Sequence, residues 1–455
     1  MTQRPLADVA DIVRGISFPK DAKSLEPHPG DVACLRTTNV QKQVEWNDLW
    51  FVPSKHVKRE EQYVRSGDIL ISTANSYELV GKVAPITGIP RRATLGAFIS
   101  LIRPREGVDP KFLYHQLAWG KTQSRIRETA STTTNISNVS TKKLAALELH
   151  FPPLDDQRRI VAEIEKQFSR LDEAVANLMR VKTNLNRYKA AVLKAAVEGR
   201  LVPTEAELAR REGRSYQSGA QLLQRILETR RDQWKGKGKY KEPVAPDTTE
   251  LPELPEGWAW ARLDAIAALR GGITVDSKRK DPTARSVPYL RVANVQRGYL
   301  DLAEIKHIDA PAADIEELRL QPGDILFNEG GDRDKLGRGW IWEGQLADCI
   351  HQNHVFRARL FFSEVSSKLL SWWGNSFGKN YFLREGKQTT NLASINLTKL
   401  SAFPVPLPPL AEQHRIVAEV DRCLSIAHEV DAEIEADLKR ANGLRQATLQ
   451  RCFVR

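Results

Sequence analysis

Two short segments carry residue types that nucleotide or metal chemistry uses, and each lacks part of the required pattern. Residues 374–380 read Gly-Asn-Ser-Phe-Gly-Lys-Asn. A phosphate loop needs four residues between its glycines and a Ser or Thr after the lysine to hold magnesium. This segment has three residues between its glycines, and Asn380 follows the lysine. His428-Glu429 lacks the second histidine of a zinc-protease helix, because Ala432 stands in its place.

Methyltransferase and nuclease signatures are also incomplete. Pro152-Pro153 has no Asn or Asp before it, so the Asn/Asp-Pro-Pro-aromatic motif of amino-methyltransferases is missing. No glycine-rich cofactor loop follows a predicted strand. Residues 322–324 with Glu329 and Lys335 have the letters of a nuclease site, but a turn that leads into a strand explains them. We therefore expect a chain without catalytic residues, with a nuclease or a methyltransferase as the alternative.

Composition and charge suggest a polyanionic partner. The 455-residue chain has 68 Lys and Arg against 57 Asp and Glu, a net charge of +11. This excess favours nucleic acid first and an anionic membrane second. The four cysteines lie far apart with no CxxC pair, so neither a disulfide framework nor a cysteine-built zinc site is expected, and a reducing cytoplasm fits. No run of about 18 apolar residues occurs, so no transmembrane span is expected.

The chain repeats itself. Residues 152–164 fall on residues 408–420 at an offset of 256, with nine of 13 positions identical. Shorter matches keep offsets of 255 to 257 and occur in the same order along the chain. They pair Gly67–Leu70 with Gly323–Leu326, Thr133–Asn135 with Thr389–Asn391, Asn39–Gln41 with Asn294–Gln296, and Gly15–Ser17 with Gly272–Thr274. Because chance does not order so many matches, the sequence predicts a tandem duplication.

Each copy has a mixed part followed by a long helix. Short alternating or apolar runs separated by Gly, Pro and Asn predict strands between loops, with a helix near 110–119 and its counterpart near 364–373. We therefore expect an α+β fold of two mixed α/β domains in tandem. The predicted boundaries are 1–151 for the first domain, 152–200 for the first helix, 201–256 for a connector, 257–407 for the second domain and 408–455 for the second helix.

The long helical segments carry the apolar spacing of a coiled coil. In the first, apolar residues recur every seven positions, with two more on alternate positions: Ile164, Leu171, Leu178, Leu185 and Val192, then Phe168 and Val175. In the second, the residues that fit are Val420, Leu424, Ile434 and Leu438, while Asp431 and Arg445 interrupt the seam. We expect the two helices to pair as an antiparallel coiled coil with pseudo-two-fold symmetry. Periodicity alone also allows homodimerisation through this stripe, or its burial against the globular part.

The connector between the copies is strongly basic. From Arg210 to Lys241 there are ten Lys and Arg against three Asp and Glu, and four prolines follow by residue 255. The connector begins with a helix-like run from Glu205 to Trp234. Its charge and prolines predict a solvated, flexible strap that ends in an extended segment. The alternative is that the strap also touches a phosphate backbone.

The loops of the two mixed domains are rich in residue types that contact phosphates and read base edges. These loops differ between the copies, while the Gly, Leu and Pro residues of the scaffold agree. This is expected of two domains that recognise different DNA sequences. The candidate DNA-binding residues are Asn75, Lys82, Arg91, Arg92, Thr134 and Asn135 in the first copy, and Arg333, Lys335, Arg338, Asn353, Thr390 and Asn391 in the second. Two alternatives stay open: duplicated surface loops drift, and the Thr-Asn pairs serve as turns or caps.

Across essentially its whole length the chain resembles the specificity (S) subunit of type I restriction-modification systems. The resemblance is carried by two Pro-Pro-Leu-x-x-Gln-x-Arg-Ile-Val-Ala-Glu segments, at 152–163 and 408–419, and by the paired Gly-Asp-Ile-Leu elements. Residues 254–260, which open the second copy, and residues 193–201, which close the first helix, also look like that family.

The resemblance implies two target-recognition domains separated by conserved helices that form an antiparallel coiled coil. It implies recognition of a split, asymmetric site in double-stranded DNA, and docking of two adenine-N6 methyltransferase (M) subunits and of motor-nuclease (R) subunits. It implies no catalytic residue, metal or cofactor in this chain, with S-adenosylmethionine, ATP and magnesium bound by cytoplasmic partners and no membrane involved. The alternatives are the DNA-recognition subunit of another multi-subunit methyltransferase-nuclease and a non-catalytic coiled-coil adaptor.

Overall fold

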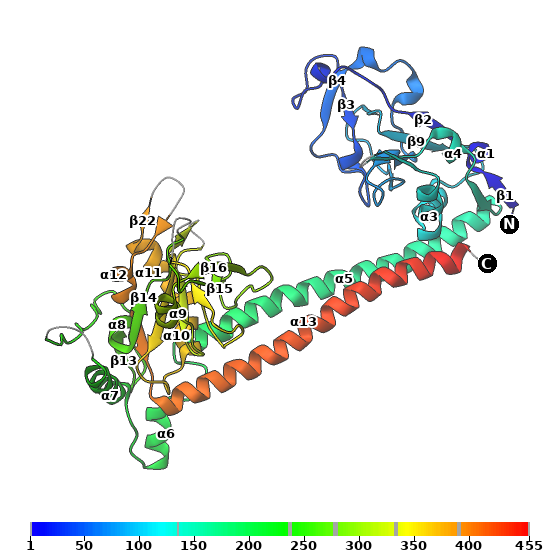
Figure 1. Ribbon diagram of the computed structural model, residues 1–455. Coiled ribbons are helices and arrows are strands. Elements are labelled where there is room, and N and C mark those ends of the chain that lie inside the picture. The colour runs from blue at the N-terminus through cyan, green and yellow to red at the C-terminus, as the bar shows by residue number, and fades with distance from the viewer. Residues whose placement is uncertain are drawn as a thin grey trace. The chain divides into compact units, whose positions relative to one another are not determined.

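Two compact units make up the chain, and the computed structural model in Figure 1 describes residues 2–133, 136–234, 239–275, 281–331, 335–388 and 393–453. One unit comprises Met1–Val181 with Glu433–Arg455, and the other comprises Lys182–Ala432. Two helices of 44 residues each, α5 (Leu154–Val197) and α13 (Leu410–Phe453), pass from one unit into the other.

The globular part of the first unit is built from three small sheets and a terminal strand pair. One sheet has the order β2 (Ala10–Arg14), β9 (Ile99–Pro104), β5 (Ile69–Ser72) and β7 (Val83–Pro85). A second has the order β4 (Trp50–Pro53), β3 (Asp31–Leu35) and β8 (Ala93–Leu95). A third has the order β10 (Ser131–Thr133), β11 (Ile136–Asn138) and β6 (Ala74–Asn75), and β1 (Thr2–Pro5) pairs with β12 (Glu148–Phe151). The helices are α1 (Leu6–Val9), α2 (Pro110–Ala118), α3 (Gly120–Glu128) and α4 (Thr141–Ala145).

The second unit repeats this arrangement strand for strand. One sheet has the order β14 (Ala267–Arg270), β21 (Val355–Leu360), β17 (Ile325–Asn328) and β19 (Gly339–Ile341). A second has the order β16 (Lys306–Ala310), β15 (Arg285–Leu290) and β20 (Ile350–His351). A third has the order β18 (Gly330–Gly331), β23 (Ala393–Ser394) and β22 (Lys387–Gln388). The terminal pair is β13 (Ala259–Arg262) with β24 (Pro404–Leu407). Its helices are α6 (Glu205–Glu212), α7 (Gly219–Asp232), α8 (Leu263–Ile266), α9 (Ala312–Leu318), α10 (Ser367–Asn375), α11 (Phe377–Glu385) and α12 (Leu397–Ser401). The tandem duplication is confirmed, and α2 and α10 lie where helices were predicted.

The repeated Gly-Asp-Ile-Leu element is a turn that starts a core strand. The Asp68 carboxylate accepts two hydrogen bonds from the Arg103 guanidinium, at 2.8 and 2.7 Å, and one from the Arg65 backbone N–H at 2.7 Å. Asp324 holds Arg359 in the same way, with both distances 2.7 Å. Because each buried carboxylate ties its own turn to the neighbouring strand, the repeat has a structural role and not that of a nuclease site.

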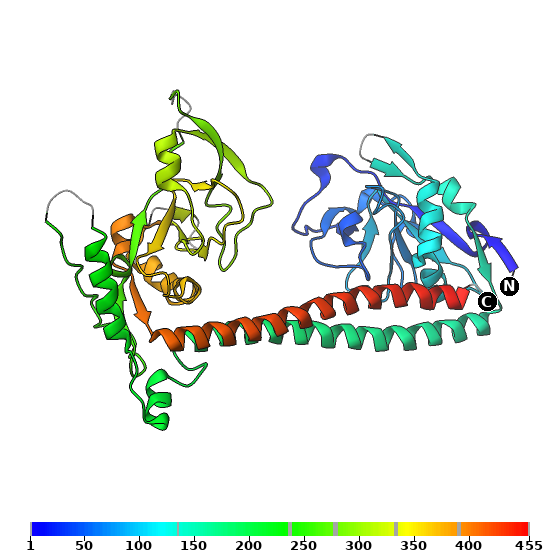
Figure 2. The same cartoon turned by 60° about the horizontal axis from the view of Figure 1, so that its bottom comes forward.

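The two long helices pair through the predicted seam. Along α5, residues shielded from solvent recur at alternating intervals of four and three: Ile164, Phe168, Leu171, Val175, Leu178, Lys182, Leu185, Lys189, Val192 and Ala196. In the first unit the Arg445 guanidinium lies 5.0 Å from the Phe168 ring centroid. In the second unit Lys189 Nζ lies 2.9 Å from Asp431 Oδ2. Higher numbers on α5 thus meet lower numbers on α13, as Figures 1 and 2 show, and the antiparallel coiled coil is confirmed.

The two residues predicted to interrupt the seam are held by partners across it. Asp431 pairs with Lys189, and Arg445 pairs with Asp172. The buried apolar seam of α13 also uses small side chains that the leucine spacing did not reveal, namely Cys423, Ala427 and Ala441. Small residues let the helix backbones approach, and a charged pair at one level favours a single register.

A double-mutant cycle across this ion pair should reveal its role in register. Lys189→Leu or Asp431→Leu alone leaves a partly buried charge without its partner, so each should lower the melting temperature by about 2–4 °C. The double variant replaces the pair by two apolar seam residues and should melt at or above the wild-type temperature. Thermal unfolding followed by tryptophan fluorescence measures this, and a double variant that loses the sum of both single losses would contradict it.

The helix-like run predicted from Glu205 to Trp234 is confirmed as α6 and α7, so the description of the connector as a flexible strap does not hold for these two helices. Both helices begin with a capping box, Thr204 with Glu207 and Ser218 with Gln221. Leu222 on α7 is fully buried in the main core of the second unit. The apolar face of α7 recurs at helical spacing, and its burial there outweighs the surrounding basic residues, which stay on the solvent side. Residues 235–238 lie outside the described residues.

Candidate nucleic-acid interface

In the first unit, the ends of strands from three sheets meet at one edge of the globular domain. Thr73 and Ala74, which follow β5, donate backbone hydrogen bonds to the Phe98 carbonyl at 2.9 and 3.2 Å. The Val139 N–H, just after β11, donates to the Thr73 carbonyl at 2.9 Å. We call this surface, made by 73–75, 96–98, 131–133 and 136–138, the first hairpin face.

The second unit has an equivalent surface. The Glu329 N–H donates to the His354 carbonyl at 2.9 Å, and the Ile395 N–H donates to the Glu329 carbonyl at 2.8 Å. These bonds repeat those of Thr73, Phe98 and Val139 at an offset of 256. We call 329–331, 352–354, 387–388 and 393–394 the second hairpin face.

The first hairpin face exposes apolar and hydroxyl side chains together. Phe98 is 65% exposed and Ile136 51% exposed, and Tyr77, which follows β6, is 51% exposed. Ser131 and Thr133 are exposed beside them on β10. Thymine methyl groups are read by apolar contact and base edges by hydrogen-bonding side chains, so this mixture suits a nucleic-acid surface.

A glutamine holds a cation next to each hairpin face. In the first unit Lys82 Nζ donates to Gln41 Oε1 at 2.6 Å, and Gln41 Nε2 donates to the Thr38 carbonyl at 3.0 Å. In the second unit Arg338 Nη1 donates to Gln296 Oε1 at 2.9 Å. The amide of Gln296 donates to the backbone carbonyl three residues earlier, at 2.7 Å, as Gln41 does. A cation held in one place by both copies suits a contact with phosphate.

The two hairpin faces differ where Phe98 has its counterpart. His354 occupies that position, and its Nδ1 lies 2.5 Å from Glu329 Oε2. In the first unit Thr73 stands where the second has Glu329. One scaffold therefore presents an apolar ring in the first domain and a polar pair in the second.

Several of the candidate DNA-binding residues lie at these faces. Asn75 is on β6, where its Oδ1 accepts from the Ser76 N–H at 2.9 Å, and Lys82 follows the same loop. Arg338 adjoins the second hairpin face, with Lys335 in the turn that leads to it, because the Arg338 N–H donates to the Lys335 carbonyl at 3.2 Å. Asn353 lies in the 352–354 turn, where its N–H donates to the Ile273 carbonyl at 2.9 Å.

The structure separates Arg91 and Arg92 from the first hairpin face. They precede β8, whereas the face follows it, so three residues of strand, about 10 Å, lie between. The Arg92 guanidinium lies 3.9 Å from the Tyr63 ring centroid, and its Nη2 lies 3.5 Å from Glu60 Oε2. The other five candidates, Thr134, Asn135, Arg333, Thr390 and Asn391, lie outside the described residues.

Three residues of this arrangement were missed by the sequence reasoning, namely Gln41, Gln296 and Phe98, whereas His354 lies in a loop that the sequence already suggested. The two glutamines end the repeated Asn-Val-Gln segments, which were read as scaffold only. Their repetition beside a repeated cation was the available signal. Phe98 carries no signal until the pairing of the strands shows that it occupies the position of His354.

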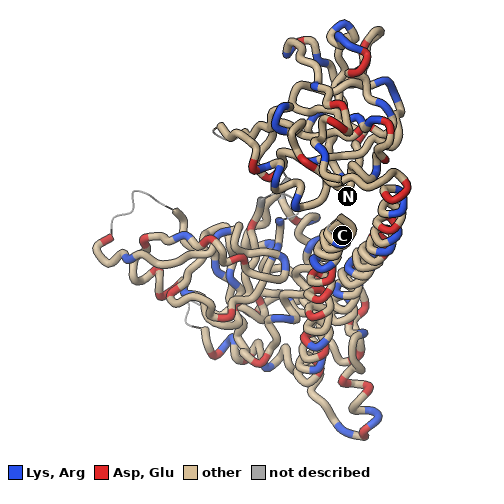
Figure 3. Tube along the Cα trace, turned by 90° about the vertical axis from the view of Figure 1, so that its right-hand side faces the viewer, with Lys and Arg blue, Asp and Glu red and all other residues tan. Residues whose placement is uncertain are grey.

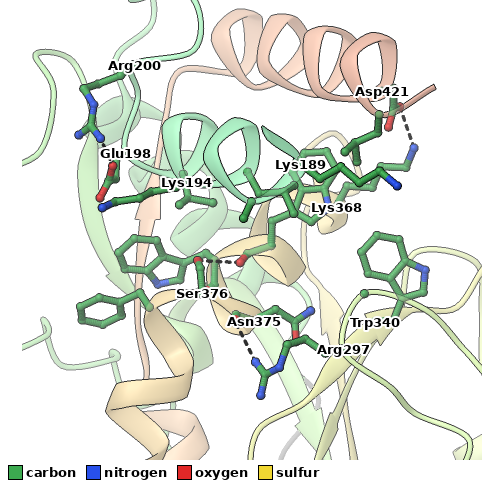
Figure 4. Close-up of a pocket in the computed structure, with 18 of the residues that line it drawn as sticks. Lys189, Lys194, Glu198, Arg200, Arg297, Trp340, Lys368, Asn375, Ser376 and Asp421 are labelled. Carbon is green, nitrogen blue, oxygen red and sulfur yellow. Dashed lines mark hydrogen bonds and ion pairs between the residues drawn. The ribbon is translucent and has the colours of Figure 1, made fainter. Parts of the chain in front are cut away.

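A cleft lies elsewhere in the second unit, between α5, α13 and the globular domain. It has a volume of about 1060 Å³. Figure 4 shows Lys189 and Lys194 reaching from α5 and Arg297 and Trp340 lying on the opposite side. Its charges are partly paired within the chain, because Lys368 Nζ lies 2.8 Å from Asp421 Oδ2 and Arg297 donates to the Asn375 carbonyl at 2.7 Å.

The segment with the letters of a phosphate loop lines this cleft, but its structure is different. Residues 374–380 join the end of α10 to the start of α11, not a strand to a helix. Both polar groups of the Asn375 side chain are bonded to the backbone of Gly339, at 3.2 and 2.7 Å. A strand-to-helix phosphate cradle is therefore absent from this described segment.

Three further features bear on other possible functions: the charge along the long helices, the grouping of possible metal ligands, and the apolarity of the helices. Charged residues of both signs occur along α5 and α13 (Figure 3), with five Lys and Arg and no Asp or Glu from Arg180 to Lys194, and five Asp and Glu and no Lys or Arg from Glu429 to Asp437. Within the described ranges, no three His, Cys, Asp or Glu side chains gather as metal ligands. No helix in that part of the chain is both long and apolar enough to cross a membrane.

Comparison with known proteins identifies the family. The model of the type I restriction modification DNA specificity domain matches residues 1–178 and 351–439, more than half of the chain. The chain belongs to this family. Its two globular parts are target-recognition domains, and each hairpin face is part of one.

Curated relatives of the same family match over nearly the whole chain. The specificity subunit of the type I restriction enzyme EcoKI from Escherichia coli is 23% identical over 454 residues, covering 99% of this chain and 87% of the relative. The StySPI specificity subunit from Salmonella potsdam is 24% identical, with the same two coverages.

Solved structures share the fold. A chain from a structural study of complex assembly and conformational transition of the type I R-M system has a TM-score of 0.63 at 18% identity, covering 99% of this chain and 97% of that one. The HsdS subunit from Thermoanaerobacter tengcongensis has a TM-score of 0.51 at 18% identity, with 99% and 96% covered.

Proposed function

We propose that this chain is the DNA-reading subunit of a type I restriction-modification complex and recognises a split, asymmetric site in double-stranded DNA. Each target-recognition domain reads one half of the site, across a spacer of unspecified bases. The observation that supports this most is the pair of hairpin faces. They share a backbone and an anchored cation, Lys82 or Arg338, but differ in the side chains presented.

In this proposal the two long helices hold partner subunits. Two adenine-N6 methyltransferase subunits dock on them, and motor-nuclease subunits join the complex. Exposed apolar side chains on these otherwise charged helices support a docking role. They are Met179, Val181 and Tyr188 on α5, and Ile426 and Leu444 on α13.

The chain itself is proposed to carry no catalytic residue. Its relatives are specificity subunits, and the motifs for nucleotide, metal and methyltransferase chemistry are incomplete in the sequence. S-adenosylmethionine, ATP and magnesium are assigned to the partners, and the reaction to the cytoplasm.

Adenine-methylation mapping by long-read sequencing tests this proposal. A host that lacks adenine methylation expresses the chain alone, its methyltransferase subunit alone, or both together. We expect one split motif that is methylated only when the chain and the methyltransferase subunit are both present. The two halves of this motif give the two half-site sequences. Methylation by the chain alone would overturn the non-catalytic assignment. If no split motif is methylated and the methyltransferase subunit does not co-purify with the chain, the proposed function is overturned in favour of an adaptor.

A further inference from the structure

We propose that Phe98 and His354, which occupy one scaffold position in the two hairpin faces, each determine one base pair of the half-site that its domain reads. This inference rests on the proposed function, because it assigns residues within the same DNA-reading surfaces. It names Glu329 as the partner of His354 in this role.

The two side chains start from the same backbone geometry. Each belongs to a turn whose last carbonyl accepts a hydrogen bond of 2.9 Å, from Thr73 in the first domain and Glu329 in the second. The turn also rests on a repeated glycine. A Cβ at Gly15 would lie 2.1 Å from the Gly96 carbonyl oxygen, and one at Gly272 would lie 1.9 Å from the His351 oxygen. The backbone beneath each turn is therefore closely packed, so it aims the side chain reproducibly.

In the first domain the position is apolar. Phe98 is 65% exposed, and Ile136 exposes further apolar surface on the same face. The major-groove edge of thymine differs from the others in its C5-methyl group, which is read by apolar contact. Phe98 is thus assigned to an A·T pair, with the ring against the thymine methyl.

In the second domain the same position holds a polar pair, His354 with Glu329. Because His354 Nδ1 lies 2.5 Å from the Glu329 carboxylate, the proton of a neutral ring stays on Nδ1. The ring Nε2 and the second carboxylate oxygen then both accept. Cytosine presents only the N4 amino donor on its major-groove edge, and carboxylates read it. This pair is thus assigned to a G·C pair.

The neighbouring cations, Lys82 and Arg338, are assigned no role in base specificity. Lys82 and Arg338 take the same place and the same glutamine partner in both domains. A contact common to both halves contributes affinity, because phosphate contacts position the protein without reading sequence.

Transplanting the polar pair into the first domain tests the assignment. The double variant Thr73→Glu/Phe98→His is expressed with the methyltransferase subunit, and methylated motifs are mapped. We expect one position of the first half-site to change from A·T to G·C, with a shift in preference of about 10- to 100-fold. The second half-site and the spacer should stay unchanged. The matched control is Ile89→His, an apolar residue 38% exposed in the loop before β8, which should leave the motif unchanged.

Each outcome decides the assignment. An unchanged first half-site with retained methylation would overturn it, as would a change in the second half-site. If the double variant loses methylation, Phe98→Ala is placed in a binding selection from DNA with randomised half-sites. A loss of base preference at one position of the first half-site then supports the assignment. An unchanged base preference at every position of that half-site overturns it. A wild-type complex that methylates no split motif would remove the proposed function itself.

Discussion

Replacing Glu412 by alanine should lower the free energy of unfolding of the second unit by about 2–6 kcal/mol. This carboxylate is fully buried near the start of α13. It accepts one hydrogen bond from Trp258 Nε1 and one from the Glu205 backbone N–H, both at 2.8 Å. Its removal leaves two buried donors unsatisfied, and each costs about 1–3 kcal/mol.

Urea unfolding followed by tryptophan fluorescence measures this loss. Seven of the ten tryptophans lie in the second unit, so the signal reports mainly on it: Trp234, Trp258, Trp260, Trp340, Trp342, Trp372 and Trp373.

The duplication supplies a matched control, Asp156→Ala. Asp156 stands at the equivalent position of α5, at an offset of 256. Its side chain is 45% exposed and pairs only with Arg159 in the bonds described, at 2.9 Å. Its loss should cost below about 0.5 kcal/mol. Both residues carry a negative charge at a helix N-terminus. Equal losses for the two variants would therefore attribute the effect to that charge and contradict the role of the buried hydrogen bonds.

Acidification from pH 6.5 to pH 4 should lower the free energy of unfolding of each unit by about 3 kcal/mol. Each unit holds one buried histidine, His115 in the first and His351 in the second. Burial lowers the pKa of both imidazoles to about 4. Between pH 6.5 and 4 the unfolded chain therefore binds a proton that the folded chain does not. Stability is complete above pH 6.5 and is lost as the pH falls through this window.

The variant His351→Leu should remove this pH dependence from the second unit. Leucine is the natural choice, because Leu95 occupies the equivalent position of the first domain and is fully buried. The variant is compared with wild type by urea unfolding at several pH values between 4 and 7. His414→Leu changes an exposed histidine of the same unit and should leave the pH profile as it is. A His351→Leu variant that loses as much stability as wild type would contradict the prediction.

The sequence by itself determined the duplication, the order of mixed part and long helix in each copy, and the apolar seam of the helices, whereas the partner of each seam came from the structure. The duplication, this order and the seam depend on spacing along the chain: the heptad positions from Ile164 to Val192, and the Gly-Asp turns at residues 67 and 323. Local spacing decides which face of a helix is apolar and where a strand starts, so both survive in the one-dimensional pattern. The family resemblance rested on the same repeated segments and is confirmed by the family match.

Only the tertiary structure decided which loops meet. Gln41 reaches Lys82, and Phe98 reaches Thr73, because β3 and β8 run parallel and β5 pairs with β9. The same pairing puts Arg92 at the opposite end of β8, although its residue type suits DNA as well as that of Lys82. Strand register sets these contacts, and register depends on pairing between segments far apart in sequence, which residue types alone do not encode.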